Sequence, residues 1–167
     1  ISQNGGTLTV LRATPLDEAE YTCIASNAAG NATNNIKVNV ITKPVIQPGK
    51  QKIIINERER LIIPCQATGR PQPSISWDKD GRPLIGSLDY IVQPDGSVVV
   101  YSVKVINSGL YTCVAKNSAG EDSAVYTVEV RVAPNIHPDR TVYNVIEGEQ
   151  IRIPCDADGD PKPLITW

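Results

Sequence analysis

The residues of this 167-residue sequence best suited to chemistry are four cysteines and a single histidine, His137. A structural metal site needs closely spaced ligands, and Cys65 and Cys113 are dozens of residues apart. One histidine does not favour a catalytic triad, and no glycine-rich phosphate loop follows a strand pattern. Pairing of the cysteines in disulfides fits the spacing better. Because disulfides persist in oxidising compartments, we expect an extracellular protein. Because the sequence favours neither a triad nor a phosphate loop, we also expect it to be non-enzymatic.

Three aspartates, Asp156, Asp158 and Asp160, surround Gly159 and form the second candidate ligand set. An EF-hand calcium loop requires a glycine at its sixth position and a glutamate at its twelfth, and neither is present here. Strand alternation would also place Asp156 and Asp158 on an outer face. We therefore interpret these aspartates as a solvated acidic edge and expect no metal ion and no cofactor.

The third candidate site is a basic stretch formed by Lys50, Lys52, Arg58 and Arg60. Such a stretch could bind an anionic polysaccharide, but Glu57 and Glu59 interleave with it, so ordinary sheet-surface charge is the simpler interpretation. The formal net charge of −2 argues against a nucleic-acid partner. Lys104 interrupts the longest valine-rich stretch, so no apolar run is long enough to insert into a membrane.

The elements around these residues repeat at a constant offset of 90 positions. The offset relates residues that are hard to match by chance: Cys23 to Cys113, Cys65 to Cys155, Trp77 to Trp167, Tyr21 to Tyr111, and Pro44 to Pro134. A period of this size corresponds to a whole domain. We therefore expect the C-terminal half of one domain in residues 1–42, a complete domain in residues 43–133 and the N-terminal half of a third in residues 134–167.

Short segments that alternate apolar and polar residues dominate the middle repeat, residues 43–133. Leu61, Ile63, Cys65 and Ala67 recur at every second position, which is typical of a strand with one buried face. Turn residues such as Pro94-Asp95-Gly96 separate these segments, and no helical period is sustained. The pattern predicts an all-β fold, a two-sheet antiparallel sandwich of about seven or eight short strands.

Two runs of the middle repeat resemble the intermediate-set (I-set) immunoglobulin domain, namely residues 69–84 and 109–120, and the same marks recur in residues 21–30 and 159–167. The resemblance implies tandem immunoglobulin-like Greek-key β-sandwiches, one complete and two truncated. In this fold a disulfide joins the sheets, a tryptophan packs against it, and a tyrosine two residues before the second cysteine hydrogen-bonds at a chain corner. The resemblance thus implies a disulfide between Cys65 and Cys113, with Trp77 and Tyr111 as structural core residues.

The two remaining cysteines, Cys23 and Cys155, would lack their normal partners because their domains are truncated. Residues 1–42 and 134–167 would also lack the strands that cover their apolar faces. We therefore expect this chain to self-associate through its ends, whereas residues 43–133 alone are expected to stay monomeric.

A glycosylation sequon, Asn31-Ala32-Thr33, follows the turn at residues 27–30. In an extracellular protein we expect Asn31 to carry a glycan, the alternative being an unmodified polar turn. The matching position of the middle repeat is Glu121, so the site is not repeated.

The chain most resembles the immunoglobulin arrays of hemicentin-type extracellular matrix proteins, followed by neural adhesion receptors. This resemblance implies a structural and adhesive role, with extracellular proteins or neighbouring immunoglobulin domains as partners. The junctions at residues 42–44 and 132–134 contain proline and no flexible linker, which favours a semi-rigid rod. The alternatives are an intracellular, titin-like muscle scaffold with reduced cysteines, and accessory domains of a receptor kinase or an extracellular peroxidase.

Overall fold

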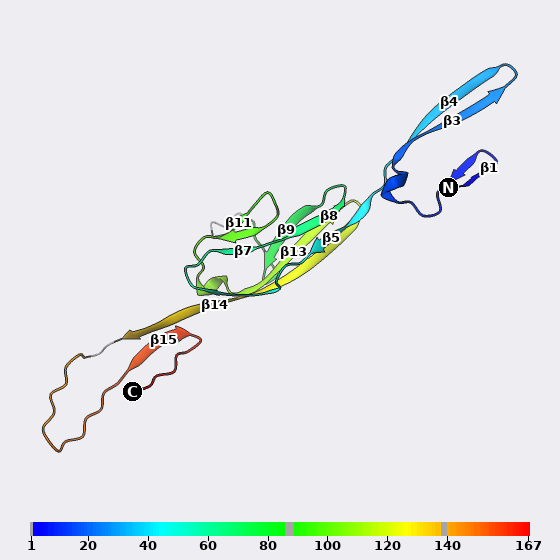
Figure 1. Ribbon diagram of the computed structural model, residues 1–167. Helices are drawn as coiled ribbons and strands as arrows, with labels where there is room; N and C mark the ends of the chain where they lie inside the picture. Colours follow the sequence, from blue (N-terminus) through cyan, green and yellow to red (C-terminus); the bar gives the residue numbers. More distant parts are fainter. Residues whose placement is uncertain (1, 86–88, 138–139) are drawn as a thin grey trace. The chain divides into compact units, whose positions relative to one another are not determined.

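A computed structural model describes residues 2–85, 89–137 and 140–167 of the chain, and its regular structure is almost entirely β (Figure 1). Contacts divide the chain into two compact units, residues 1–45 with 67–74 and 115–122, and residues 46–66 with 75–114 and 123–167. The all-β, immunoglobulin-like sandwich predicted from the sequence is confirmed in the middle repeat.

In the N-terminal segment, the described residues 2–38 fold as two antiparallel hairpins and one short 3-10 helix. The first hairpin pairs β1 with β2, and the second pairs β3 with β4 from Ala19 opposite Val38 to Asn27 opposite Gly30. The elements are β1 (Ser2–Asn4), β2 (Thr7–Thr9), η1 (Pro15–Asp17), β3 (Ala19–Asn27) and β4 (Gly30–Val38). Among the described residues, β3 and β4 form a sheet of their own (Figure 1).

The larger sheet of the middle repeat has the order β10-β9-β13-β14, with β6 parallel to β14. Its hairpin of β13 and β14 repeats the β3–β4 hairpin at the 90-residue offset, and the second strand of each hairpin begins at a glycine. The strands are β6 (Lys52–Asn56), β9 (Ser74–Lys79), β10 (Arg82–Pro83), β13 (Gly109–Asn117) and β14 (Gly120–His137).

The facing strands form one three-stranded sheet of order β11-β12-β7 and one two-stranded sheet of β5 and β8. The segment expected to form one strand from Leu61 to Ala67 is divided, since Pro64 has no N–H to donate to a ladder. The elements are β5 (Thr42–Gln47), β7 (Leu61–Ile63), β8 (Gln66–Arg70), β11 (Ile91–Val92), β12 (Val98–Val100) and η2 (Val105–Asn107).

The hydrophobic core lies between these sheets and follows the predicted alternation. Of the four residues expected on the buried face of the first strand, Ala67 is half-buried and the other three are buried. Alternating residues of the core strands are buried: Leu61, Ile63, Cys65, Val98, Val100, Val103, Tyr111, Cys113, Ala115, Ala124, Tyr126, Val128 and Val130. Val99 is buried as well, which the alternation does not predict.

The C-terminal segment, residues 134–167, contributes β15 (Asp156–Asp160), which pairs antiparallel with the end of β14. The register shifts between Val132 and Asn135, on either side of Pro134. A proline cannot donate a ladder hydrogen bond, which accounts for an irregularity at this point.

Candidate functional site

The chemical centre of the middle repeat is a disulfide between Cys65 and Cys113, with a Cα–Cα distance of 6.4 Å. Cys65 follows β7 and Cys113 lies in β13, so the bond joins the two facing sheets. Both cysteines are almost completely buried. The bond therefore acts as a covalent cross-link, and its sulfurs are shielded from nucleophilic chemistry.

Trp77 of β9 is buried in the same core and is oriented by a hydrogen bond. Its indole Nε1–H donates to the carbonyl of Gly96 at 2.7 Å, and its ring lies 5.7 Å from that of Tyr126. Gly96 has φ +85°, and a side chain there would place its Cβ 2.8 Å from the carbonyl oxygen of Cys65. The turn thus brings the chain close to the disulfide and supplies the acceptor that a buried indole needs.

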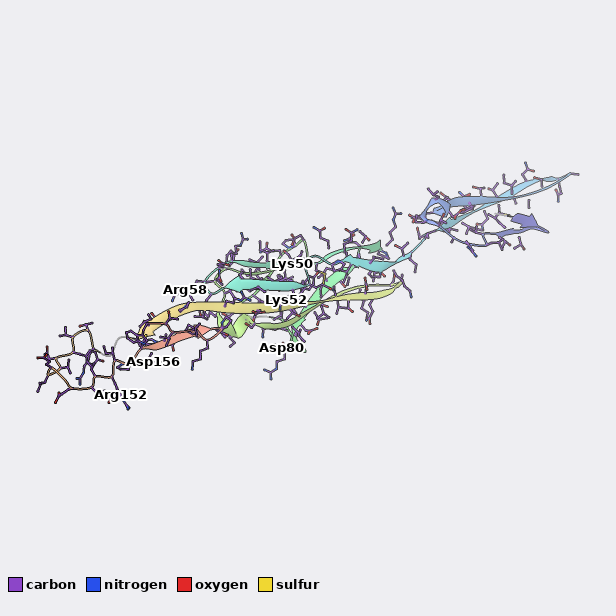
Figure 2. All side chains as sticks on the ribbon, turned by 60° about the horizontal axis from the view of Figure 1, so that its bottom comes forward. Lys50, Lys52, Arg58, Asp80, Arg152 and Asp156 are labelled. Atoms are coloured by element: carbon purple, nitrogen blue, oxygen red, sulfur yellow. A yellow bond between two sulfur atoms is a disulfide. The ribbon has the colours of Figure 1, made fainter. Side chains whose placement is uncertain are left out.

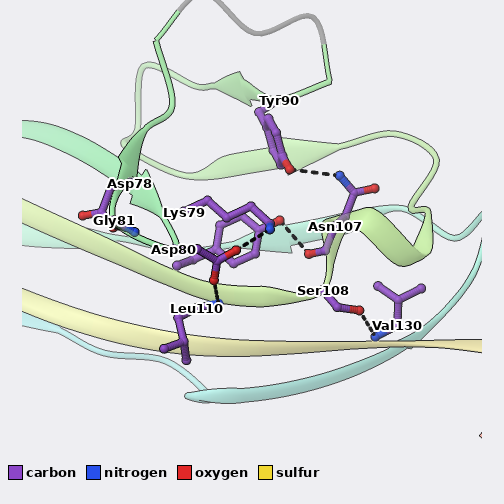
Figure 3. Close-up of polar contacts among 10 residues, drawn as sticks. Asp78, Lys79, Asp80, Gly81, Tyr90, Asn107, Ser108, Leu110 and Val130 are labelled. Atoms are coloured by element: carbon purple, nitrogen blue, oxygen red, sulfur yellow. Dashed lines mark hydrogen bonds and ion pairs between the residues drawn. The ribbon is translucent and has the colours of Figure 1, made fainter.

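Tyr111 closes the chain corner that precedes β13, where Figure 3 shows Asn107 and Tyr90. Its hydroxyl donates to the carbonyl of Asn107 at 2.8 Å, and the Asn107 side-chain amide donates to the Tyr90 hydroxyl at 3.2 Å. Burial, aided by the neighbouring Tyr90, raises the pKa of Tyr111 far above its ordinary value. The phenol therefore stays protonated and serves as a structural donor.

The same corner occurs in the N-terminal segment, where the Tyr21 hydroxyl donates to the carbonyl of Asp17 at 2.9 Å. Asp17 stands where the middle repeat has Asn107, and its carboxylate accepts from the backbone and hydroxyl of Thr14. These hydrogen bonds from Thr14 lower the pKa of Asp17. The corner is thus a repeated local structure and does not depend on whether an acid or an amide caps it.

Replacing Tyr111 by phenylalanine should lower the free energy of unfolding of the middle repeat by about 1–3 kcal/mol, because the buried carbonyl of Asn107 loses its donor. Tyr101→Phe is the matched control, since the Tyr101 side chain is 60% exposed. Urea titration of both variants measures the difference. Equal stabilities would show that the corner hydrogen bond contributes nothing.

The Asp80 carboxylate lies at the turn between β9 and β10 and has two hydrogen-bond donors. Its oxygens accept from Lys79 Nζ at 2.6 Å and from the Leu110 backbone N–H at 2.9 Å (Figure 3). The Lys79 side chain, followed by the Leu110 N–H, holds the pKa of Asp80 below its ordinary value. Asp80 therefore ties the turn to β13 as a carboxylate and has no proton to transfer near neutral pH.

Two residues of the basic stretch interact with other side chains of the middle repeat. Lys52 forms an ion pair with Glu129 of the adjacent strand at 3.3 Å, and the Arg60 guanidinium lies 5.4 Å from the Tyr101 ring centroid. Figure 2 shows Lys50 and Lys52 beside β6 and Arg58 at the following turn. Two of the four cations thus have partners on the same surface, which favours ordinary sheet-surface charge.

The three aspartates of β15 are exposed, with Ala157 and Gly159 between them half-buried. Asp158 Oδ2 lies 2.6 Å from His137 Nε2 across the β14–β15 pair. Among the described residues, no group of three histidine, cysteine, aspartate or glutamate side chains has a geometry that could hold a metal ion.

Asn31 and the two remaining cysteines lie at accessible positions. Asn31 is exposed in β4, two residues from Thr33 and opposite Ser26 of β3. Cys23 is exposed and Cys155 is half-buried, and both carry free thiols.

A group of polar contacts at Thr42 was not foreseen from the sequence. The Asn117 side-chain amide donates to the carbonyls of Thr42 and Pro71, both at 2.8 Å, and the Arg70 N–H donates to the Thr42 hydroxyl at 2.9 Å. The Arg70 guanidinium also lies 3.5 Å from the Glu18 carboxylate. These residues are far apart in the sequence, so no local motif reveals the group.

Across residues 2–85, 89–137 and 140–167, no helix is long and apolar enough to span a membrane. The polar contacts described above stabilise turns, the chain corner and strand pairs of the fold.

Comparison with known proteins agrees with this architecture. The family model of the immunoglobulin I-set domain matches residues 1–40 and 44–130. Mouse Hemicentin-1 is 39% identical over 166 residues, which cover 98% of this chain and 3% of the relative. Chicken Neural cell adhesion molecule 1 is 31% identical, over 98% of this chain and 16% of the relative.

Among solved structures, a three-domain fragment of titin, I67–I69, superposes with a TM-score of 0.72 at 27% identity. The match covers 95% of this chain and 61% of the fragment. This chain therefore spans only a small part of the length of the curated relatives that it matches. With the family model covering most of the chain and Hemicentin-1 similar along nearly all of it, the chain belongs to the immunoglobulin I-set family.

Proposed function

We propose that this chain is a non-enzymatic, adhesive segment of an extracellular protein built from many immunoglobulin domains, secreted into the matrix or displayed on the cell surface. The buried disulfide between Cys65 and Cys113 is the observation that carries the proposal, because such bonds persist in oxidising compartments. The similarity to Hemicentin-1 and to Neural cell adhesion molecule 1 supports the same assignment. Its partners are extracellular proteins or other immunoglobulin domains that contact the exposed sheet faces.

The segment is proposed to consist of parts of three domains, with boundaries at residues 42/43 and 133/134. The interruption of the family match between residues 40 and 44 supports the first boundary. The prolines at the junctions support stiff connections, which suit a spacer that holds adhesive surfaces apart.

An intracellular scaffold is the second candidate, and the likeness to the titin fragment favours it. The two functions differ in the redox state of the middle repeat. Protein from its natural source should be denatured, alkylated and analysed by mass spectrometry. A disulfide-linked peptide pair containing Cys65 and Cys113 supports the extracellular function, whereas alkylated thiols at both positions favour the scaffold.

We expect Asn31 to be glycosylated when the chain passes through a secretory pathway, because its side chain is exposed and the sequon is intact. Thr33→Ala should abolish the glycan, seen as loss of the endoglycosidase-sensitive mass. Thr22→Ala, a change on the neighbouring β3 outside the sequon, should leave that mass intact. An unmodified Asn31 in secreted wild-type chain would refute the expectation.

A further inference from the structure

The outer face of the three-stranded sheet of the middle repeat carries a row of aliphatic side chains. Val99 of β12 pairs with Ile62 of β7 on one side and with Ile91 of β11 on the other. Residues directly opposite in antiparallel strands share a face, and the alternate residues Val98 and Ile63 are completely buried in the core. The row therefore faces away from the core, with Ile62 48% and Ile91 42% exposed.

A tyrosine ring and a guanidinium extend this row at the next pair of positions. Tyr101 follows Val99 by two residues and Arg60 precedes Ile62 by two, so alternation gives them the same face. The Arg60 guanidinium lies 5.4 Å from the centroid of the Tyr101 ring, which agrees with this placement. Tyr101 is 60% exposed, so the ring enlarges the accessible apolar surface.

The fold does not require aliphatic residues in the row, because other repeats of the chain have polar residues at the same positions. At the 90-residue offset, Ile62 corresponds to Arg152 in the third repeat. Val99 corresponds to Thr9 in the first repeat. This comparison concerns residue identity alone and does not depend on what covers the end segments. A contiguous exposed apolar face that the fold does not require indicates a surface that binds another surface.

Arg60 supplies the charge of this face. Its contact with the Tyr101 ring engages the flat side of the guanidinium and leaves the N–H groups available as donors. Within the described part of the chain, Arg60 has no carboxylate at ion-pair distance. The neighbouring Glu59 carboxylate instead accepts from the backbone and side-chain amides of Asn56. A carboxylate from outside would match the guanidinium in charge and in geometry.

We propose that this face binds a segment of a partner protein in which a carboxylate lies beside branched aliphatic side chains. The carboxylate pairs with Arg60, and the aliphatic side chains pack on Ile62, Ile91 and the Tyr101 ring. Tyrosine and arginine are the residue types that, with tryptophan, contribute most of the binding energy in protein interfaces. Binding of this kind rests on the adhesive function proposed above, and assigns it to one face and one class of partner.

An anionic polysaccharide matches this face less well, because it presents many charges and needs several cations close together. Arg60 is accompanied here by apolar side chains. Figure 2 shows Lys50 and Lys52 beside β6, which belongs to the other sheet. The mixture of one cation with an apolar surface therefore favours a protein.

The probe is a phage-displayed library of short random peptides, selected against the full chain with its middle disulfide oxidised. Enriched peptides are expected to contain aspartate or glutamate next to valine, isoleucine or leucine. Synthetic copies are then titrated by fluorescence anisotropy. Ile62→Arg, which introduces the residue of the third repeat, should weaken binding at least about tenfold. Arg60→Gln introduces the residue of Gln150 and should weaken binding to a similar degree.

Ile54→Arg is the matched control, because Ile54 is 45% exposed on β6 of the other sheet and the substitution is the same. It should leave peptide binding unchanged. Each variant should keep the near-ultraviolet circular dichroism of wild type. If Ile62→Arg does not fold, the surface substitution Arg60→Gln decides alone.

Three results would overturn the proposal. Equal peptide binding by wild type and Ile62→Arg, or no enriched peptide at all, would mean that this face is not the binding surface. Enriched peptides without acidic residues that bind Arg60→Gln as tightly as wild type would refute the partner chemistry. Binding of a heparin fragment that Arg60→Gln abolishes and Ile62→Arg strengthens would assign the face to an anionic polysaccharide.

These outcomes are separable from failure of the extracellular function, which is tested by the redox state of Cys65 and Cys113 in the natural protein. Linked cysteines together with equal binding by wild type and Ile62→Arg would keep the adhesive function and remove this face. Free thiols at both positions together with binding that depends on Ile62 would keep the face and assign it to an intracellular scaffold.

Discussion

Removing the Cys65–Cys113 cross-link by a double substitution to alanine is expected to lower the free energy of unfolding of the middle repeat by about 4 kcal/mol. The bond closes a loop with a sequence separation of 48, and the loop-entropy relation gives this magnitude. A domain of this size has a total stability of about 5–15 kcal/mol, so the loss is a large fraction of it.

The measurement is a urea titration of the oxidised full chain, followed by the fluorescence of Trp77 in a Trp167→Phe background. Cys23→Ala/Cys155→Ala is the control, because these thiols are free and lie outside the buried core. At protein concentrations low enough to prevent association, the control should shift stability by less than about 0.5 kcal/mol. Similar midpoints for the two double variants would show that the disulfide does not stabilise the sandwich.

The core of the middle repeat could be predicted because a strand with one buried face has an apolar residue at every second position. Tyr111, Cys113 and Ala115 follow this rule and are all buried. The rule fails at Val99, which is 2% exposed although it alternates with the inward Val98 and Val100. Ile62 and Ile91 are its cross-strand partners, and the alternation along a single strand carries no information about such neighbours.

Strand partners could not be read from periodicity, because alternation identifies a strand without saying what it pairs with. The parallel pairing of β6 with β14 is an example, and it sets Lys52 near Glu129. The interpretation of the basic stretch as surface charge rested on interleaved glutamates in the sequence. In the structure, Lys52 of β6 forms its ion pair with Glu129, which lies on β14.

The proposed boundary at residues 133/134 lies within one continuous strand. β14 continues past Pro134 to His137 and pairs with β15 on both sides of the proline. The ladder tolerates the proline by shifting register between Val132 and Asn135. The sequence does not reveal this register shift, because it depends on the pairing of β14 with β15.

Replacing Trp77 by alanine is expected to cost about 3–5 kcal/mol of unfolding free energy, the usual range for removing a buried aromatic side chain. Trp77 is 5% exposed, lies 5.7 Å from the Tyr126 ring, and satisfies the Gly96 carbonyl, so both a cavity and an unpaired acceptor would result. Near-ultraviolet circular dichroism during urea unfolding reports the change without relying on tryptophan fluorescence.

Trp167→Ala provides a control with the same chemistry at the equivalent repeat position, because Trp167 is 86% exposed. In dilute Cys23→Ser/Cys155→Ser protein, where end-to-end association is suppressed, this change should alter middle-repeat stability by less than about 0.5 kcal/mol. Because the two substitutions remove the same side chain, the difference between their effects measures what the burial of the Trp77 indole contributes to stability. If both substitutions had the same small effect, Trp77 would not be part of the core that holds the two sheets together, and the structural role assigned to it would be wrong.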